Sequence, residues 1–342
     1  MDCVSGMVLT KEGMEKGYLI YSNGRVVEKG KVTPPIRPKV RGYIIPRPIN
    51  SHTHIGDAFI RKKVKNLPRD IEKLVAPPHG LKHVLLEKAD RDEIICGMKE
   101  KLREMEKTGI SAFCDFREGG KEGVNILKKV LEEFNLKGII LSRPKSLEFD
   151  ENEVLDLLMI SDGIGLSSVS DWDYEEIKSI ASLAKEKGKL FAIHASERVR
   201  EDIDKILDLK PDFLIHMNKA NQEDLEKVKE EDIPIVVCPR SNEFFGLKPN
   251  LELFRKVGIE LSLGTDNAMI STPDVYEEMV WIKRNFGGFS IEELLRMITY
   301  NPGKIFDVKF PEFVENEPAD FVVLDTKSLK PILVSVSEAD RP

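Results

Sequence analysis

The chain has 342 residues, of which 41% are hydrophobic, so it can bury a large core and is not disordered by composition. Its formal net charge of −7 argues against a broad basic surface for nucleic acid. No apolar run reaches the roughly 18 residues of a bilayer span, and the N-terminus does not resemble a signal peptide. These features predict a cytoplasmic protein that binds neither membranes nor nucleic acid.

Residues 1 to about 40 have the pattern of short strands joined by turns. The dipeptide Asn23-Gly24 separates the apolar runs 18–20 and 25–27, and Asn-Gly favours the positive φ angles of a tight hairpin. The Pro-rich stretch 33–38 predicts a linker.

From residue 41 to residue 309, short apolar runs alternate with charged, amphipathic segments. The spacing predicts helices at 90–107, 121–134, 174–187 and 273–285, among others. Strands are predicted at 42–48, 110–116, 137–142, 163–168, 190–194, 213–217, 234–238 and 260–265. Eight strands that alternate with helices indicate an α/β fold, a parallel (β/α)8 TIM-like barrel.

The apolar segment 317–325 comes too late to be a ninth barrel strand. We expect it to pair with the N-terminal strands. The sequence therefore predicts two units: a small β-sandwich built from both chain ends, residues 1–40 and 310–342, and a hydrolase barrel formed by residues 41–309.

Histidines are scarce in this chain, six in all, and four of them lie at predicted strand ends. His52 and His54 are two residues apart, so their side chains point to the same face. His194 and His216 end the fifth and sixth strands, and Asp266 ends the eighth. The carboxyl ends of barrel strands face one mouth, so these side chains should converge there. Three imidazoles and one carboxylate suit a divalent ion, Zn²⁺ or Fe²⁺.

Glu197 follows His194 by three residues, just beyond the strand end. There it could carry a proton from water to a leaving group, or simply favour the N-terminus of the next helix. Asp266 could both bind the metal and accept a proton from the water. His79 and His83 lie in the loop after the first strand; they could cover the mouth or belong to an exposed loop.

These motifs resemble those of the amidohydrolase superfamily, in particular its cytosine deaminase and triazine chlorohydrolase branch. The similar segments are 52–54, 194–197, 216, 238–242, 263–267, 301–306 and 318–325. The resemblance implies one metal ion held by His52, His54, His194 and Asp266. It also implies that Glu197 transfers protons. His216 would contact the attacking water or the tetrahedral centre, and it could also be a further metal ligand. Two-metal members carry a carboxylated lysine at the end of the fourth strand or a bridging carboxylate elsewhere, and segment 164–169 has no lysine.

Loops after the strands supply substrate contacts in such barrels. The candidates are Arg143, Trp172, Arg240, Asn242 and Asn267. Arg143 could clamp a carboxylate or phosphate, or pair with a helix carboxylate. Trp172 could stack on a heterocycle or cap the barrel core, and Asn267 could orient the substrate or cap the next helix.

The resemblance implies a metal-dependent aminohydrolase, which acts on C–N bonds other than peptide bonds. Water would attack an amidine-like carbon of a purine, pyrimidine, pterin or related ring, and ammonia would leave. The alternative is a cyclic amide hydrolase or chlorohydrolase with the same mononuclear site. A non-catalytic binding or assembly role is disfavoured, because every expected ligand is present. The expected partner is a small heterocycle, and pairing of two barrels through their outer helices stays open.

Overall fold

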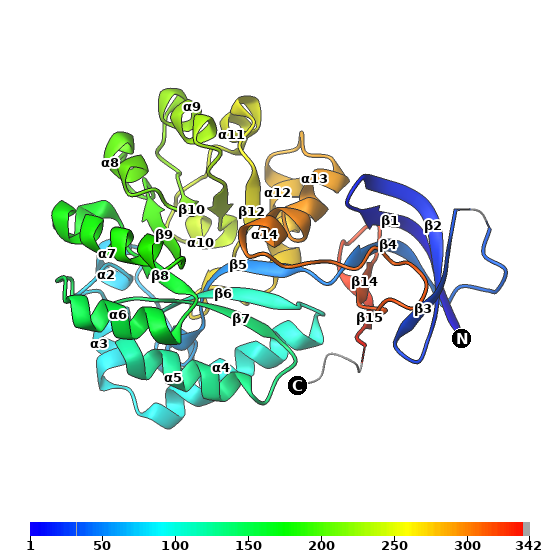
Figure 1. The fold of residues 1–342 in the computed structure, drawn as a ribbon, viewed down its shortest axis with the longest axis horizontal. Helices are drawn as coiled ribbons and strands as arrows, with labels where there is room; N and C mark the ends of the chain where they lie inside the picture. Colours follow the sequence, from blue (N-terminus) through cyan, green and yellow to red (C-terminus); the bar gives the residue numbers. More distant parts are fainter. Residues whose placement is uncertain (32, 338–342) are drawn as a thin grey trace.

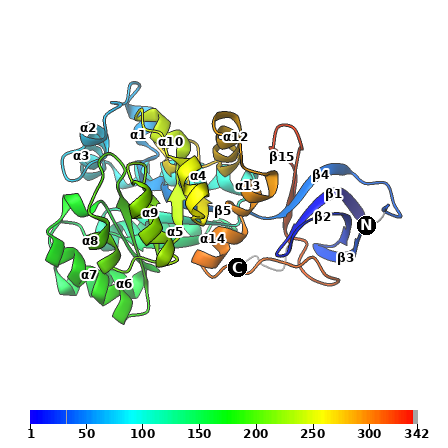
Figure 2. The ribbon, with the colours of Figure 1, turned by 90° about the horizontal axis from the view of Figure 1, so that it is seen from above.

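Both chain ends build one six-stranded sheet, which lies beside the barrel in the computed structural model (Figures 1 and 2). The structure describes residues 1–31 and 33–337, so the end of the predicted 310–342 segment lies outside the described residues. In spatial order the strands are β15 (Pro331–Ser335), β14 (Phe321–Leu324), β4 (Val40–Pro46), β1 (Asp2–Thr10), β2 (Gly13–Ser22) and β3 (Arg25–Gly30). Asn23 and Gly24, with φ of 51° and 70°, make the predicted hairpin turn between β2 and β3.

The strand expected at 42–48 is not a barrel strand, and this prediction was wrong. It forms β4, which pairs with β1 and with the late strand β14 in the small sheet. Ile44 and Ile45 point to opposite faces of β4, and both are fully buried. Burial on both faces gives the continuous apolar run that a barrel strand also shows, so the sequence pattern could not separate the two.

The barrel begins instead at β5 (Ile49–His54), and its strands follow one another around the sheet in chain order. The others are β6 (Ala112–Arg117), β7 (Lys137–Ser142), β8 (Gly163–Leu166), β9 (Leu190–Ala195), β10 (Phe213–His216), β11 (Ile235–Val237) and β12 (Leu261–Leu263). A two-residue strand, β13 (Asp266–Asn267), pairs with β5 in parallel. This pairing joins the last barrel strand to the first, which confirms the predicted TIM-like barrel.

Helices cover the outside of the barrel and connect its strands (Figure 1). The longer ones are α4 (Arg91–Lys107), α5 (Gly120–Leu131), α6 (Glu151–Ile160), α7 (Tyr174–Glu186), α9 (Gln222–Glu230) and α12 (Val275–Asn285). The predicted helices correspond to α4, α5, α7 and α12. Their starts follow N-capping side chains in α4, α7 and α12; Asp90 and Glu93, for example, form a capping box at α4.

Shorter helices lie in the remaining connections of the chain. They are α1 (Ile60–Lys63), α2 (Ile71–Leu74), α3 (Leu81–Lys88), α8 (Ile203–Asp208), α10 (Pro239–Phe244), α11 (Leu251–Val257), α13 (Ile291–Arg296) and α14 (Tyr300–Ile305), with 3-10 turns at Ile55–Asp57 and Val169–Asp171. Within the described ranges, no helix combines the length and the apolar character needed to cross a membrane.

The interior of the barrel is packed with apolar side chains below its mouth. Phe116, Phe213 and Phe306 form a chain of edge-to-face ring contacts, and Ile215 and Val236 belong to the same buried cluster. A filled interior is normal for this architecture, in which side chains from alternate strands stack in layers. It leaves the carboxyl ends of the strands as the place where polar side chains can gather.

Candidate active site

Four side chains predicted as metal ligands meet at the mouth of the barrel. His52 Nε2 lies 3.2 Å from His194 Nε2 and 3.4 Å from Asp266 Oδ1. His54 Nε2 lies 3.6 Å from the same carboxylate oxygen. One ligand atom from each of the four residues falls within 4.8 Å of every other. Histidine nitrogens and a carboxylate this close together form a candidate site for a divalent metal ion.

The protonation of these groups suits such an ion. Burial lowers the pKa of His54 to about 4. Burial, with the neighbouring imidazole of His52, holds the pKa of His194 well below its usual range. Burial alone would raise the pKa of Asp266, but the hydrogen bond and charge of His52 hold it well below its usual value. Neutral imidazoles and an ionised carboxylate are the forms that bind a metal.

Hydrogen bonds fix both oxygens of the Asp266 carboxylate. Ser241 Oγ donates to Oδ2 at 2.5 Å, and Asn267 Nδ2 donates to Oδ1 at 2.9 Å. Asp266 itself has φ of 59°, a conformation that non-glycine residues seldom adopt. His216 is in the same region, with φ of 75°. Strained backbone of this kind often marks functional sites, where the surrounding packing holds it.

Gly264 sets how closely the last barrel strand approaches His52. A Cβ on Gly264 would lie 2.6 Å from His52 Cβ and 2.9 Å from its backbone nitrogen. The next residue, Thr265, donates its N–H to the carbonyl of His52 at 2.9 Å. No side chain fits between these two segments without moving the histidine.

We therefore expect Gly264→Ala to lower the free energy of unfolding by about 1–3 kcal/mol, the usual cost of overpacking, and also to weaken metal binding. Calorimetric unfolding and metal analysis of the purified variant would measure both. Gly188→Ala is the control, since nothing lies within 4 Å of its Cβ; its φ of 62° costs about 1–2 kcal/mol in stability but should leave the metal in place. Metal binding by Gly264→Ala equal to wild type would contradict the prediction.

Glu197 and His216 form a second group beside Asp266, and the three could themselves contact a metal. His216 Nε2 lies 3.4 Å from Glu197 Oε1. Asn242 Nδ2 lies 3.2 Å from His216 Nδ1 and donates to Glu197 Oε1 at 3.3 Å. Burial, with the nearby charge of Asp266, raises the pKa of Glu197 well above its ordinary value. A carboxyl group with a raised pKa is suited to give and take protons near neutral pH.

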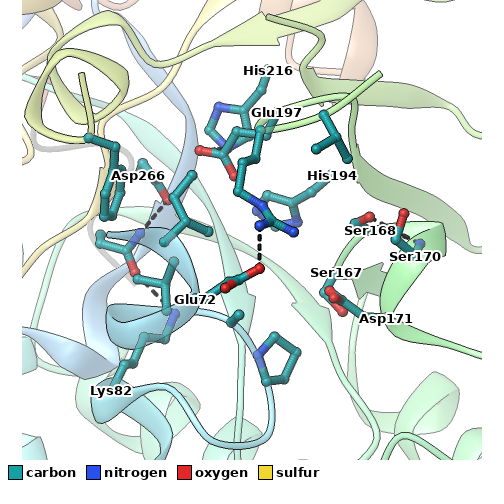
Figure 3. A pocket seen from close by; sticks show the side chains of 18 of the residues that line it. Glu72, Lys82, Ser167, Ser168, Ser170, Asp171, His194, Glu197, His216 and Asp266 are labelled. Carbon is teal, nitrogen blue, oxygen red and sulfur yellow. Dashed lines mark hydrogen bonds and ion pairs between the residues drawn. The ribbon is translucent and has the colours of Figure 1, made fainter. Parts of the chain in front are cut away.

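A cavity of about 200 Å³ opens onto these groups (Figure 3). His194, His216, Glu197 and Asp266 form one part of its wall. Across the cavity lies a polar wall from the loop after β8, with Ser167, Ser168, Ser170 and Asp171. Three of the candidate ligands, His54, His194 and Asp266, thus face one space together with Glu197 and His216, and this space is large enough for a small molecule to approach them.

The five predicted substrate contacts separate into two groups. Arg143 and Asn267 line the cavity, whereas Trp172, Arg240 and Asn242 are not among its lining residues. Trp172 is 8% exposed and its indole donates to Ser167 Oγ at 3.1 Å. The guanidinium of Arg240 pairs instead with the buried Glu278, at 2.6 Å, and with the carbonyl of Thr272. Asn242 holds Glu197 and His216, as described above.

The two loop histidines, His79 and His83, lie in different surroundings. His79 is exposed, whereas His83 is part-buried and lies against Arg143, with 3.5 Å between Nδ1 and Nη2. Burial and the charge of Arg143 lower the pKa of His83 to about 3. His83 lines a neighbouring cavity of about 500 Å³, which shares Arg143 and Pro77 with the first.

Sequence reasoning missed two buried charged residues that line the cavity, Lys82 and Glu201. Lys82 is on α3, where one lysine among several gives no signal in the pattern. Glu201 accepts a hydrogen bond from the backbone of Ser196, next to Glu197, at 2.7 Å, and further ones from Ser168 and Ser170. The sequence Ser196–Glu201 resembles a reciprocal capping arrangement, because Ser196 Oγ accepts in turn from the Glu201 N–H at 3.1 Å.

The chain is similar to known proteins both in sequence and in fold. The model of the amidohydrolase family matches residues 43–341. An uncharacterized protein of Methanocaldococcus jannaschii is 35% identical over 324 residues, which cover 89% of this chain and 81% of that protein. A 5-methylthioadenosine/S-adenosylhomocysteine deaminase of Thermoanaerobacter pseudethanolicus is 24% identical over 321 residues, 81% of this chain and 72% of the deaminase.

The fold is also found among solved structures. The crystal structure of an adenosine deaminase from Xanthomonas campestris with bound zinc has a TM-score of 0.74 to this chain, at 14% identity. The similarity covers 97% of this chain and 93% of that structure, and it supports the fold alone. The family match is the stronger finding, because it spans most of the chain and includes every residue of the candidate metal cluster. This chain therefore belongs to the amidohydrolase family.

Proposed function

We propose that this hydrolase, which acts on C–N bonds, removes an amino group from a heterocyclic ring and releases it as ammonia. The observation that carries the proposal is that the cluster of His52, His54, His194 and Asp266 meets Glu197 and His216 at one cavity, which all of these residues except the buried His52 line. The first group suits metal binding and the second suits proton transfer. The similarity to deaminases in sequence and in fold favours ammonia as the leaving group.

His52, His54, His194 and Asp266 would hold one divalent ion, zinc or iron. When bound, such an ion makes water acidic enough to act as a nucleophile at neutral pH. Zinc is the metal in the adenosine deaminase from Xanthomonas campestris. The donor set accepts either metal, so metal content has to be measured rather than inferred.

Glu197 is the proposed proton carrier. It takes a proton from the attacking water, whose oxygen forms a bond to the ring carbon. It then delivers that proton to the exocyclic nitrogen, the C–N bond breaks, and ammonia leaves a ring hydroxyl, which becomes the ring carbonyl when its proton moves to the adjacent ring nitrogen. Burial raises the pKa of Glu197, so the carboxyl group can hold the proton between the two steps.

His216 is proposed to stabilise the oxygen that adds to the ring. Asn242 Nδ2 faces His216 Nδ1 at 3.2 Å, so Nδ1 accepts and the ring proton sits on Nε2, on the side of Glu197 and Asp266. Burial lowers the pKa of His216 to about 4, which keeps the imidazole neutral near pH 7. A neutral Nε2–H donor aimed at the reacting centre favours the developing charge there.

Ammonia release from a panel of amino-substituted purines, pyrimidines and pterins tests the proposal, with the metal content of the protein measured in parallel. We expect release from at least one ring class. Removal of the metal with a chelator should abolish release, and zinc or ferrous iron should restore it. Protein that holds one metal per chain yet releases no ammonia from any ring would overturn deamination and favour cyclic amide hydrolysis.

Arg143 is the proposed contact for an anionic group on the substrate. Its side chain is 12% exposed, lies 3.9 Å from Glu118, and lines both cavities. Its side-chain contacts are long, 3.9 Å to Glu118 and 3.5 Å to His83 Nδ1, so the guanidinium can still pair with an anionic ligand. We expect Arg143→Met to raise KM by about 10–100-fold for substrates that carry a carboxylate or phosphate, since a hydrogen bond to a charged group contributes about 1.5–3 kcal/mol.

The control for this change is Lys145→Met, because Lys145 is exposed in the same loop. It should leave KM unchanged for all substrates. Steady-state kinetics with a charged and an uncharged substrate of the same ring would separate the two cases. An equal change of KM for both substrates of Arg143→Met would remove the anion contact from the proposal.

A further inference from the structure

Lys82 is a buried lysine that contacts residues supporting two of the candidate metal ligands. It is 2% exposed, and its Nζ lies 2.5 Å from Glu118 Oε1 and 3.1 Å from Asn267 Oδ1. Burial of an ammonium group is costly unless the charge is paired and hydrogen-bonded. Figure 3 shows Lys82 and Asp266 on the same side of the cavity. The contacts of Lys82 therefore decide what it does there.

The first contact leads to Asp266. A lysine ammonium can only donate hydrogen bonds, so the atom of Asn267 that faces Lys82 must be its carbonyl oxygen. This directs the other end of the amide, Nδ2, toward Asp266 Oδ1, to which it donates at 2.9 Å. Without Lys82, the amide of Asn267 loses the group that fixes its orientation. A rotated amide would present its oxygen to the carboxylate, which is repulsive.

The second contact leads to His54. Glu118 Oε1, which Lys82 holds, lies 2.9 Å from His54 Nδ1, and the carbonyl of Phe116 lies 3.1 Å from the same nitrogen. Two acceptors at Nδ1 place the ring proton there and leave Nε2 free to bind an ion. Carboxylates behind a ligating histidine in this way fix its tautomer and its orientation. Arg117 Nη2 holds the other oxygen of Glu118 at 3.0 Å.

We propose that Lys82 is a positioning residue for the metal site. One ammonium group orients Asn267 against Asp266 and Glu118 against His54, two ligands that lie on neighbouring strands, β13 and β5. Lys82 comes from α3, in the long segment between β5 and α4, so its side chain links this segment to the candidate metal site. The inference rests on the proposed metal site but not on any particular substrate.

Cobalt binding by the full-length, metal-depleted protein tests this role without using activity. We expect Lys82→Met to bind Co²⁺ about 10–100-fold more weakly than wild type in competition with a chromophoric chelator, the usual loss when a supporting residue is removed. Lys88→Met is the matched control, since Lys88 ends the same helix and is exposed; it should bind Co²⁺ as wild type does. Equal Co²⁺ affinity for Lys82→Met and wild type would overturn the proposal.

Double variants separate positioning from a general loss of packing. If Lys82 acts through Asn267, the double variant Lys82→Met/Asn267→Ala should lose no more affinity than the weaker-binding single variant. Ser241→Ala removes the other hydrogen bond to Asp266, along a separate path. In the double variant Lys82→Met/Ser241→Ala, the fold-losses of Co²⁺ affinity of the two single variants should therefore multiply, because independent effects add as free energies. Multiplied losses for both pairs would contradict the route through Asn267.

Two further outcomes distinguish this inference from the proposed function. If Lys82→Met fails to fold, as judged by circular dichroism, Asn267→Ala decides, and unchanged Co²⁺ affinity of that variant would overturn the proposal. A wild-type protein that binds no Co²⁺ would overturn the metal site and the role of Lys82 together. A wild-type protein that binds Co²⁺ but deaminates no ring would overturn the proposed function. Weaker Co²⁺ binding by Lys82→Met would in that case still support the role of Lys82 as a positioning residue.

Discussion

Asp266→Ala is expected to abolish turnover and metal binding together. The change removes the only carboxylate of the candidate cluster and leaves three imidazoles, so the site loses both a ligand and the negative charge that offsets the ion. A loss of several kcal/mol of transition-state stabilisation corresponds to a fall in kcat of more than about 10³-fold. Metal analysis after dialysis and steady-state kinetics on the same preparation would measure both effects.

Ser241→Ala is the control for this variant. It keeps the carboxylate and removes only the hydrogen bond to Oδ2. We expect it to retain metal with reduced affinity and to remain active. An Asp266→Ala protein with wild-type metal content and turnover would show that this carboxylate is not a ligand, and the mechanism proposed above would then be wrong.

Glu197→Gln is expected to lower kcat by about 10²–10⁴-fold, the range of general acid–base catalysis, with the metal retained. The amide has nearly the same shape as the carboxyl group, but it can neither take a proton from water nor deliver one to the leaving nitrogen. The metal should be retained because Glu197 is not one of the four candidate ligands. Burst and steady-state measurements of ammonia release, normalised to bound metal, would test this.

Glu72→Gln serves as the matched control, because Glu72 lines the same cavity and its side chain is 62% exposed. Its kcat should stay within about twofold of wild type, because the ion pair of Glu72 with Arg198 is exposed, and exposed ion pairs contribute little free energy. A kcat for Glu197→Gln within a few-fold of wild type at equal metal content would assign the proton transfer to another group, of which Asp266 is the nearest candidate.

The two variants fail in different ways, and the difference is informative. Asp266→Ala should lose metal and activity, whereas Glu197→Gln should lose activity alone. Loss of metal from Glu197→Gln would mean that the group formed by Glu197, His216 and Asp266 also holds an ion. The pair thus tests whether one site or two operates at the mouth of the barrel.

The convergence of the candidate metal ligands could be predicted from sequence because the architecture determines where each strand end lies. In a parallel barrel every strand carries its C-terminal residue to the same mouth. His52, His194 and Asp266, which are far apart in the chain, were therefore expected to meet, and they do. The apolar runs located the ends of β9, β10 and β12 to within a few residues, whereas His52 lies on β5, directly after the run at 42–48 that forms β4.

Side-chain partners could not be predicted in this way. Arg240 follows a barrel strand, as a substrate contact would, but its long side chain reaches Glu278 on α12 instead of the cavity. Asn242, on the same short helix α10, turns inward to His216 and Glu197. Which direction such a side chain takes depends on neighbours that are remote in sequence.

By itself, the sequence determined the alternation of strands and helices, the hairpin at Asn23-Gly24 and the identity of the groups at the strand ends. These depend on local spacing and on the backbone preferences of single residues. Only the tertiary structure decided that β4 belongs to the small sheet and that Lys82 contacts Glu118 and Asn267 beside the candidate metal cluster. An apolar run packs equally well in either sheet, and a lysine in a charged helix is normally exposed. Contacts with residues that are distant in the chain settle both cases, and local sequence does not encode them.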